Sequence, residues 1–164
     1  MLHRPELLFL DEPTSAVDPQ SRRDFWEKLF ELSDEGTTIL VSTHYMDEAE
    51  RCHELAILDR GALAAHGEPA QMMEDIPARV VLVTSSDPRD CTESLKNLDQ
   101  VTGITQIGNQ LRVQVPEDIE DPENLVSRAL EKAGMDHEVQ EVSANLEDVF
   151  VAATNHKRAG ERAA

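Results

Sequence analysis

Two adjacent carboxylates and one histidine have the types and spacing that suit chemistry on phosphates. Asp11 and Glu12 come directly after the apolar run of residues 7–10, and His44 follows the β-branched, apolar run of residues 37–43. Short apolar runs of this kind are typical of strands buried in a parallel sheet. Ligands of open α/β sheets bind beyond the carboxyl ends of the strands, where these three side chains are expected.

An Asp–Glu pair at a strand end has a specific use and an ordinary one. Asp11 can hold a Mg²⁺ ion through water, because Mg²⁺ uses few carboxylates and retains its waters. Glu12 can polarise a water molecule that attacks a terminal phosphate. Taken alone, however, the pair also fits two solvated carboxylates, and His44 alone fits a hydrogen-bonded histidine at a strand end. The surrounding residues must therefore decide.

The surrounding residues resemble one family. Residues 7–19 read LLFLDEPTSAVDP, and residues 40–44 read LVSTH one strand later. In order, spacing and strand context, these segments resemble the ATP-binding-cassette (ABC) ATPases. LLFLDE resembles the Walker B motif of that family, SAVD resembles its D-loop, and His44 resembles its switch histidine.

The resemblance implies a role for each residue and two cofactors, ATP and Mg²⁺. Asp11 is expected to contact the Mg²⁺ shell, and Glu12 to act as the general base or to position the attacking water. His44 is expected to contact the γ-phosphate. Ser15 and Asp18 belong to the D-loop, and Asp18 is expected to cross to a second ABC ATPase domain in a head-to-tail dimer.

Two further segments narrow the resemblance to the multidrug-export branch of the family. Residues 42–52 read STHYMDEAERC, and residues 146–150 read LEDVF, which resembles the closing motif of a domain appended in that branch. The resemblance implies an ATP-binding subunit of an efflux transporter that works with an ABC-2 type membrane permease. Such a subunit is cytoplasmic and lies at the inner face of the cell membrane.

The phosphate-binding motifs of the family do not occur in these residues. A phosphate-cradling loop needs a G-x-x-x-x-G-K-[ST] run, and none of the 7 glycines precedes a lysine. A glycine-rich signature of the LSGGQ type is also missing. Because phosphoryl transfer depends on positioning and electrostatics, we expect the chain alone neither to bind ATP tightly nor to hydrolyse it. Whether these residues are a fragment of a longer protein or a split-gene product stays open.

The patterning predicts an α/β fold in two parts. Residues 1–67 indicate the order β-α-β-α-β-β, a parallel sheet with an antiparallel tail, which the resemblance implies is part of a P-loop NTPase (ABC ATPase) sheet. Its first helix is expected between Asp18-Pro19 and Gly36. Residues 78–153 indicate β-α-β-β-α-β, a ferredoxin-like order. We therefore expect an ATPase part over residues 1–75, an accessory domain over 76–154 and a disordered tail over 155–164.

Charge excludes one class of partner. The chain has 164 residues and a net charge of −18, from 33 acidic and 15 basic residues. A surface this acidic repels nucleic-acid phosphates, so no nucleic-acid partner is expected. The 2 cysteines form neither a disulfide framework nor a zinc site, and no apolar run approaches the ~20 residues that span a bilayer.

Two other functions stay open at this point. In one, residues 76–154 form a binding or regulatory module that docks a partner, and the ATPase remnant is inert. In the other, the chain belongs to a translation-associated ABC ATPase. The acidity of the chain and the export-like segment 44–52 disfavour that second alternative.

Overall fold

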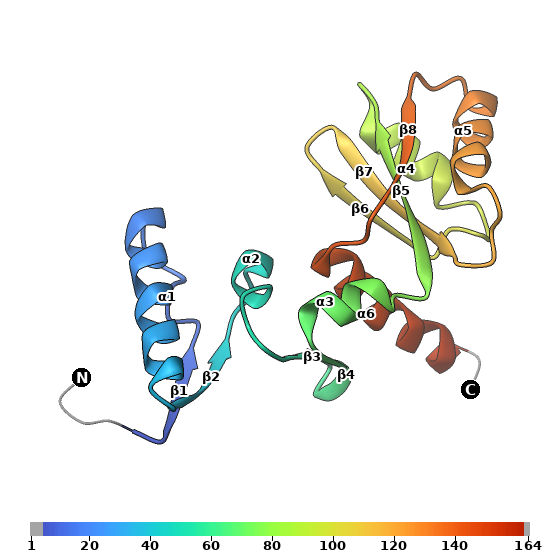
Figure 1. Cartoon of the computed structure of the whole chain (residues 1–164). Coiled ribbons are helices and arrows are strands. Elements are labelled where there is room, and N and C mark those ends of the chain that lie inside the picture. The colour runs from blue at the N-terminus through green and yellow to red at the C-terminus, as the bar shows by residue number, and fades with distance from the viewer. Residues whose placement is uncertain (1–4, 163–164) are drawn as a thin grey trace. The chain divides into compact units, whose positions relative to one another are not determined.

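The structure is a computed structural model that describes the backbone of residues 5–162 and the side chains of residues 5–155 (Figure 1). The chain forms two compact units that divide between Arg51 and Cys52. The sequence placed a domain boundary later, near residue 75. Each unit has its own sheets, helices and buried side chains.

In the first unit a parallel pair of strands carries the predicted site. Strand β1 (Leu7–Asp11) pairs with β2 (Thr38–Ser42), and helix α1 (Pro19–Asp34) connects them. A short helix, α2 (Met46–Ala49), follows β2. The register places Asp11 opposite Ser42, so the residues that follow the two strands leave from the same edge.

Helix α1 has the ends that its sequence predicted. Asp18 is the N-cap and Pro19 the first helical residue. The backbone leaves the helix at Gly36, whose φ of 96° lies in the left-handed region that glycine adopts without strain. The positions of α1, β1 and β2 therefore follow from local sequence signals.

The two faces of the β1–β2 pair differ in cover. Leu7, Phe9 and Leu40 are 49%, 67% and 60% exposed on one face. On the other face side chains are partly buried, and α1, whose Trp26 and Leu29 are buried, packs against β2. The sequence predicted that both faces of these strands are buried. The described residues of this unit bury only one of the two faces.

The second unit begins with a separate hairpin. Strands β3 (Leu55–Asp59) and β4 (Ala62–Gly67) pair only with each other among the described residues, and helix α3 (Pro69–Glu74) follows. Arg60 and Gly61 make the turn with φ values of 50° and 77°. The hairpin itself was predicted, and within the second unit it forms a two-stranded sheet of its own.

A four-stranded antiparallel sheet forms the larger part of the second unit. Its strands lie in the order β6-β7-β5-β8. The elements follow along the chain as β5 (Ala78–Thr84), α4 (Pro88–Leu95), β6 (Gly103–Ile107), β7 (Gln110–Pro116), α5 (Pro122–Lys132) and β8 (Glu138–Val142). The molecule is therefore mixed α/β, and these six elements have the predicted order along the chain.

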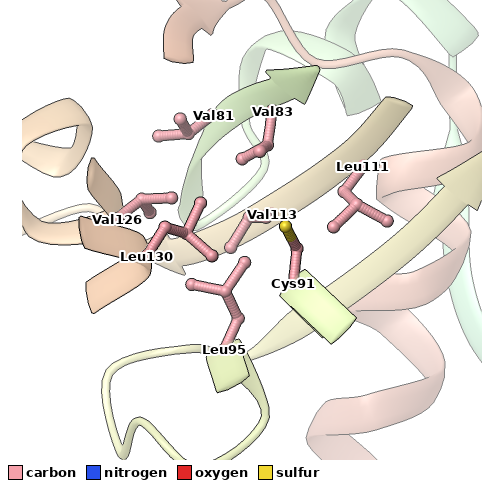
Figure 2. Packing of buried hydrophobic residues seen from close by; sticks show 8 residues of the cluster. All are labelled: Val81, Val83, Cys91, Leu95, Leu111, Val113, Val126 and Leu130. Carbon is pink, nitrogen blue, oxygen red and sulfur yellow. The ribbon is translucent and has the colours of Figure 1, made fainter. Parts of the chain in front are cut away.

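Helices cover both faces of this sheet. On one face, α4 and α5 pack on β5 and β7 around eight buried side chains shown in Figure 2: Val81, Val83, Cys91, Leu95, Leu111, Val113, Val126 and Leu130. Successive residues of a strand point to opposite faces. Arg112 and Gln114 accordingly face away from this cluster and contact helix α6 (Leu146–Arg162).

Helix α6 is fixed at its start by a reciprocal cap. The Asp148 N–H donates to Asn145 Oδ1 at 3.0 Å, and the Asn145 N–H donates to Asp148 Oδ2 at 2.9 Å. The helix continues to Arg162, whereas the sequence placed its end at Ala153 and a disordered tail from residue 155. Residues 163–164 of that tail lie outside the described residues.

No helix in the described part is long and apolar enough to cross a membrane.

Candidate functional site

The chain turns sharply where β1 ends. Glu12 has a φ of 42°, in the left-handed region that side chains other than glycine rarely adopt. Its N–H donates to both the carbonyl oxygen and the Oγ of Ser42, each at 3.0 Å. Residues held in sparsely populated backbone conformations cluster at functional sites. Here the hydrogen bonds to β2 hold Glu12 in this conformation.

Ser42 contacts both predicted acidic residues, although the sequence did not predict it as a site residue. Its Oγ accepts from the Glu12 N–H and donates to Asp11 Oδ1. The contact depends on the parallel pairing of β1 with β2, which places Ser42 directly opposite Asp11. Knowing that the two strands pair in this register would have been enough to find Ser42 from the sequence.

The structure brings Glu12 and His44 together. His44 Nδ1 lies 3.4 Å from Glu12 Oε1, and the two side chains are 54% and 51% exposed. They come from residues that follow two neighbouring strands, as the sequence predicted. Both groups can therefore be reached by water and by a ligand at the carboxyl ends of the strands.

The two predicted D-loop residues lie in the connection between β1 and α1. The Ser15 N–H donates to the Glu12 carbonyl oxygen at 3.2 Å, and the Ser15 side chain is exposed. Asp18 Oδ1 accepts from the N–H groups of Gln20 and Ser21 at 3.0 and 3.1 Å. The hydrogen bonds from Ser21 hold the pKa of Asp18 below its usual value. Asp18 thus caps α1 with one carboxylate oxygen.

Asp11 fits a magnesium ion held mainly by other ligands. Its side chain is exposed, and Oδ2 accepts no hydrogen bond from the described residues. Within that part of the chain no three His, Cys, Asp or Glu side chains gather to hold a metal ion. Mg²⁺ typically binds one or two carboxylates and completes its shell with water and substrate phosphates. A single carboxylate here suits such an ion better than a protein-only site.

Relatives of the chain are ABC transporter ATP-binding proteins. The chain is 37% identical over 159 residues to the Nod factor export ATP-binding protein I of Burkholderia thailandensis, which covers 96% of this chain and 50% of that protein. It is 33% identical over 157 residues to the daunorubicin/doxorubicin resistance ATP-binding protein DrrA of Streptomyces peucetius, covering 93% and 47%. The chain belongs to the ABC transporter ATP-binding proteins. The resemblance seen in residues 7–44 is thereby confirmed.

Other comparisons refine this assignment. The chain is 43% identical over 88 residues to the probable multidrug ABC transporter ATP-binding protein YbhF of Escherichia coli, covering 54% of this chain and 14% of that protein. The relatives named here carry export, multidrug or drug-resistance names. It spans about half the length of the first curated relatives it matches. No family model matches the chain.

Proposed function

We propose that this chain supplies the hydrolytic groups of an ATP-driven exporter: the base Glu12, the switch residue His44 and the magnesium carboxylate Asp11. The observation that carries the proposal is the 3.4 Å approach of His44 Nδ1 to Glu12 Oε1. Asp11 lies next to this pair at the same edge of the β1–β2 pair. The export names of the relatives support the transport role.

The chemistry follows from the positions of these groups. Glu12 faces solvent beyond the strand ends, where its carboxylate accepts a proton from a water molecule or orients it for attack on a terminal phosphate. His44 would donate or accept a hydrogen bond to the water or to the phosphate at the same place. Bound Mg²⁺–ATP would supply the phosphate and the cation that neutralises its charge. Asp11 would hold that cation through its water shell.

The same proposal assigns the remaining parts of the chain. Residues 1–75 form part of a P-loop NTPase sheet, and residues 76–154 form a ferredoxin-like accessory domain, which the order β6-β7-β5-β8 supports. Asp18 and Ser15 contact a second ABC ATPase domain in a head-to-tail dimer. An ABC-2 type permease binds the subunit at the cytoplasmic face of the membrane.

A chimera tests the proposed chemistry. This chain replaces the matched residues of the Burkholderia thailandensis relative, so that the rest of that relative supplies the phosphate-binding loop. We expect Mg²⁺-dependent ATP hydrolysis, and we expect Glu12→Gln to lower kcat by at least about 100-fold while ATP binding is retained. Glu50→Gln, which removes the same charge from an exposed side chain, is the matched control. Hydrolysis that survives Glu12→Gln contradicts the assignment of the base.

The isolated chain provides the complementary test. Because its 164 residues contain no phosphate-cradling loop, we expect it to show no ATP turnover above the buffer rate. Steady hydrolysis by the purified chain that Glu12→Gln abolishes would overturn this expectation.

A further inference from the structure

Glu48 is a buried carboxylate to which the predicted site gives no role. It lies on α2 and is 1% exposed. Its two oxygens accept hydrogen bonds from two different segments: Thr14 Oγ1 donates to Oε1 at 2.5 Å, and Thr43 Oγ1 donates to Oε2 at 2.7 Å. Thr14 follows Glu12 by two residues, and Thr43 comes directly before His44. One rigid carboxylate thus bridges the two segments that carry the proposed catalytic pair.

Helix α1 surrounds the same carboxylate with further polar groups. Arg22 Nε lies 3.6 Å from Glu48 Oε1. Among the described residues, Arg22 Nε and Trp26 Nε1 are buried and find no hydrogen-bond partner of normal geometry, and the carboxylate charge of Glu48 lies beside Arg22 Nε. Burial raises the pKa of Glu48, but the hydrogen bonds from Thr14 and Thr43, the indole of Trp26 and the charge of Arg22 outweigh it. The pKa lies below its usual value of 4.5.

A second set of contacts fixes the residues on either side of His44. Thr43 Oγ1, which donates to Glu48, also accepts from the Tyr45 N–H at 3.1 Å. The Arg22 guanidinium lies 4.1 Å from the centroid of the Tyr45 ring. The centroids of the Tyr45 and His44 rings lie 4.1 Å apart. Both neighbours of His44 are therefore held by groups that contact Glu48.

We propose that Glu48 is a positioning residue that sets the distance between Glu12 and His44. It acts by tying the segment after β1 to the segment after β2, and it does not itself contact a nucleotide. The tie between the two segments follows from these contacts alone. Its effect on catalysis rests on the proposed function. Misplacing a catalytic group by about 1 Å can cost on the order of 100-fold in rate, so such a tie matters.

The bridge is strongest with a carboxylate. A glutamine has the same size but one acceptor oxygen and one N–H₂ donor in place of two acceptor oxygens. Its oxygen accepts from one of the two threonines, and it reaches the other only by donating to that hydroxyl oxygen, so two charge-assisted hydrogen bonds become weaker neutral ones. Glu48→Gln also removes the charge opposite Arg22. The substitution should therefore loosen the tie without leaving a cavity.

NMR spectroscopy of the isotope-labelled 164-residue chain tests the tie. The chain has 1 Trp and 1 Tyr, so the indole N–H of Trp26 and the ring of Tyr45 give unique signals. We expect Glu48→Gln to shift the Trp26 indole signal and to abolish the nuclear Overhauser contact between the His44 and Tyr45 rings. Glu50→Gln should leave both unchanged. A shifted indole signal with an intact His44–Tyr45 contact overturns the inference, because Glu48 then only supports α1.

Thr14→Val in the parent chain provides a second test, and this single variant does not require Glu48→Gln to fold. It removes one hydroxyl from the bridge, and we expect it to shift the signals of His44 through Glu48. In the Glu48→Gln background the same change should leave His44 unmoved. If Thr14→Val leaves His44 unmoved in the parent chain, the tie is absent and the inference fails.

Activity of the chimera separates this inference from the proposed function. We expect Glu48→Gln to lower kcat by about 10-fold, with a change of less than about 2-fold in the KM for ATP, because it misaligns Glu12 and His44 without touching bound nucleotide. A lower kcat in Glu12→Gln but not in Glu48→Gln overturns the positioning role and leaves the proposed function intact. An inactive parent chimera contradicts the proposed function, while the NMR result still decides the tie.

Discussion

The β1–β2 pair and the sheet β6-β7-β5-β8 differ in how far they bury their apolar side chains. The four-stranded sheet has helices on both faces, and Val81, Val83 and Leu111 have no exposed surface. The parallel pair has one covered face and leaves Phe9 and Leu40 67% and 60% exposed. Parallel strands normally have both faces covered, so the pair departs from the usual arrangement more than the antiparallel sheet does.

The proposed catalytic groups and the larger cluster of buried apolar side chains therefore lie in different units of the chain. The proposed catalytic groups lie at the edge of the less covered pair, and the buried Glu48 joins the two segments that carry them through Thr14 and Thr43. The four-stranded sheet holds the aliphatic cluster and a buried ion pair between Arg112 and Asp148. The unique Trp26 lies in the first unit, so its fluorescence follows unfolding of that unit separately from methyl signals of β5 and β7.

The largest effect is expected at the ion pair of the second unit. The Asp148 side chain has no exposed surface, and its Oδ2 lies 2.6 Å from Arg112 Nη2. The Arg112 side chain is 13% exposed. Asp148→Ala leaves the Arg112 charge nearly buried and also removes the acceptor of the Asn145 N–H at the start of α6, and we expect a loss of about 3–5 kcal/mol in the free energy of unfolding. Urea unfolding followed by methyl NMR of β5 and β7 measures it. Glu147→Ala is the control, and the Trp26 transition should stay in place.

A matched pair of leucines tests the difference in cover directly. Leu95 has no exposed surface, whereas Leu40 is 60% exposed. We expect Leu95→Ala to cost about 3 kcal/mol, through lost burial and a residual cavity, and Leu40→Ala to cost less than about 0.5 kcal/mol. Urea midpoints from methyl NMR and from Trp26 fluorescence provide the two values. Equal costs would mean that the two sheets do not differ in cover in solution.

Gly103 tests how closely α6 approaches the sheet. A Cβ built on Gly103 would lie 2.8 Å from both Gln114 Oε1 and Val151 Cγ1. We expect Gly103→Ala to cost about 1–3 kcal/mol in the second unit, because the contact forces side chains or backbone to move. Adding Val151→Ala should make the combined loss smaller than the sum of the two single losses. Additive losses in the urea midpoints would show that α6 does not pack this closely.

The smallest effect concerns pH and the first unit. The folded-state pKa of Glu48 lies below its usual value of 4.5. Its ionised form therefore stabilises this unit above that value, and the stabilisation is lost as pH falls through the lowered pKa. We expect the urea midpoint of Trp26 fluorescence to fall on acidification below 4.5, and to fall less in Glu48→Gln. The same decrease in the parent chain and in Glu48→Gln would assign the pH dependence to other carboxylates.

Much of the local structure could be predicted from the sequence. Asp18-Pro19 and Gly36 fixed the ends of α1, because a cap, a proline at the first turn and a left-handed glycine each act over a few residues. The apolar runs predicted β1 and β2, and the residues after them placed Glu12 and His44 beyond the ends of these two strands. Their roles in catalysis stay predictions.

Pairing and burial could not be predicted in the same way. Among the described residues β3 pairs only with β4, which its apolar pattern does not say. The pattern of β1 likewise does not say that the face of the strand with Phe9 is the exposed one. Both depend on what packs against a strand, which local periodicity does not encode. The hydroxyl and carboxylate contacts of Ser42 and Glu48 likewise join residues about 30 positions apart in the chain.

By itself, the sequence determined the family, the order of the elements and the acidic and histidine side chains of the proposed site. Only the tertiary structure decided that Ser42 holds the backbone of Glu12 and that Glu48 ties Thr14 to Thr43. The physical reason is that residue type fixes which chemistry is possible, whereas distance fixes whether it occurs. Distances between remote residues arise from strand register and helix packing.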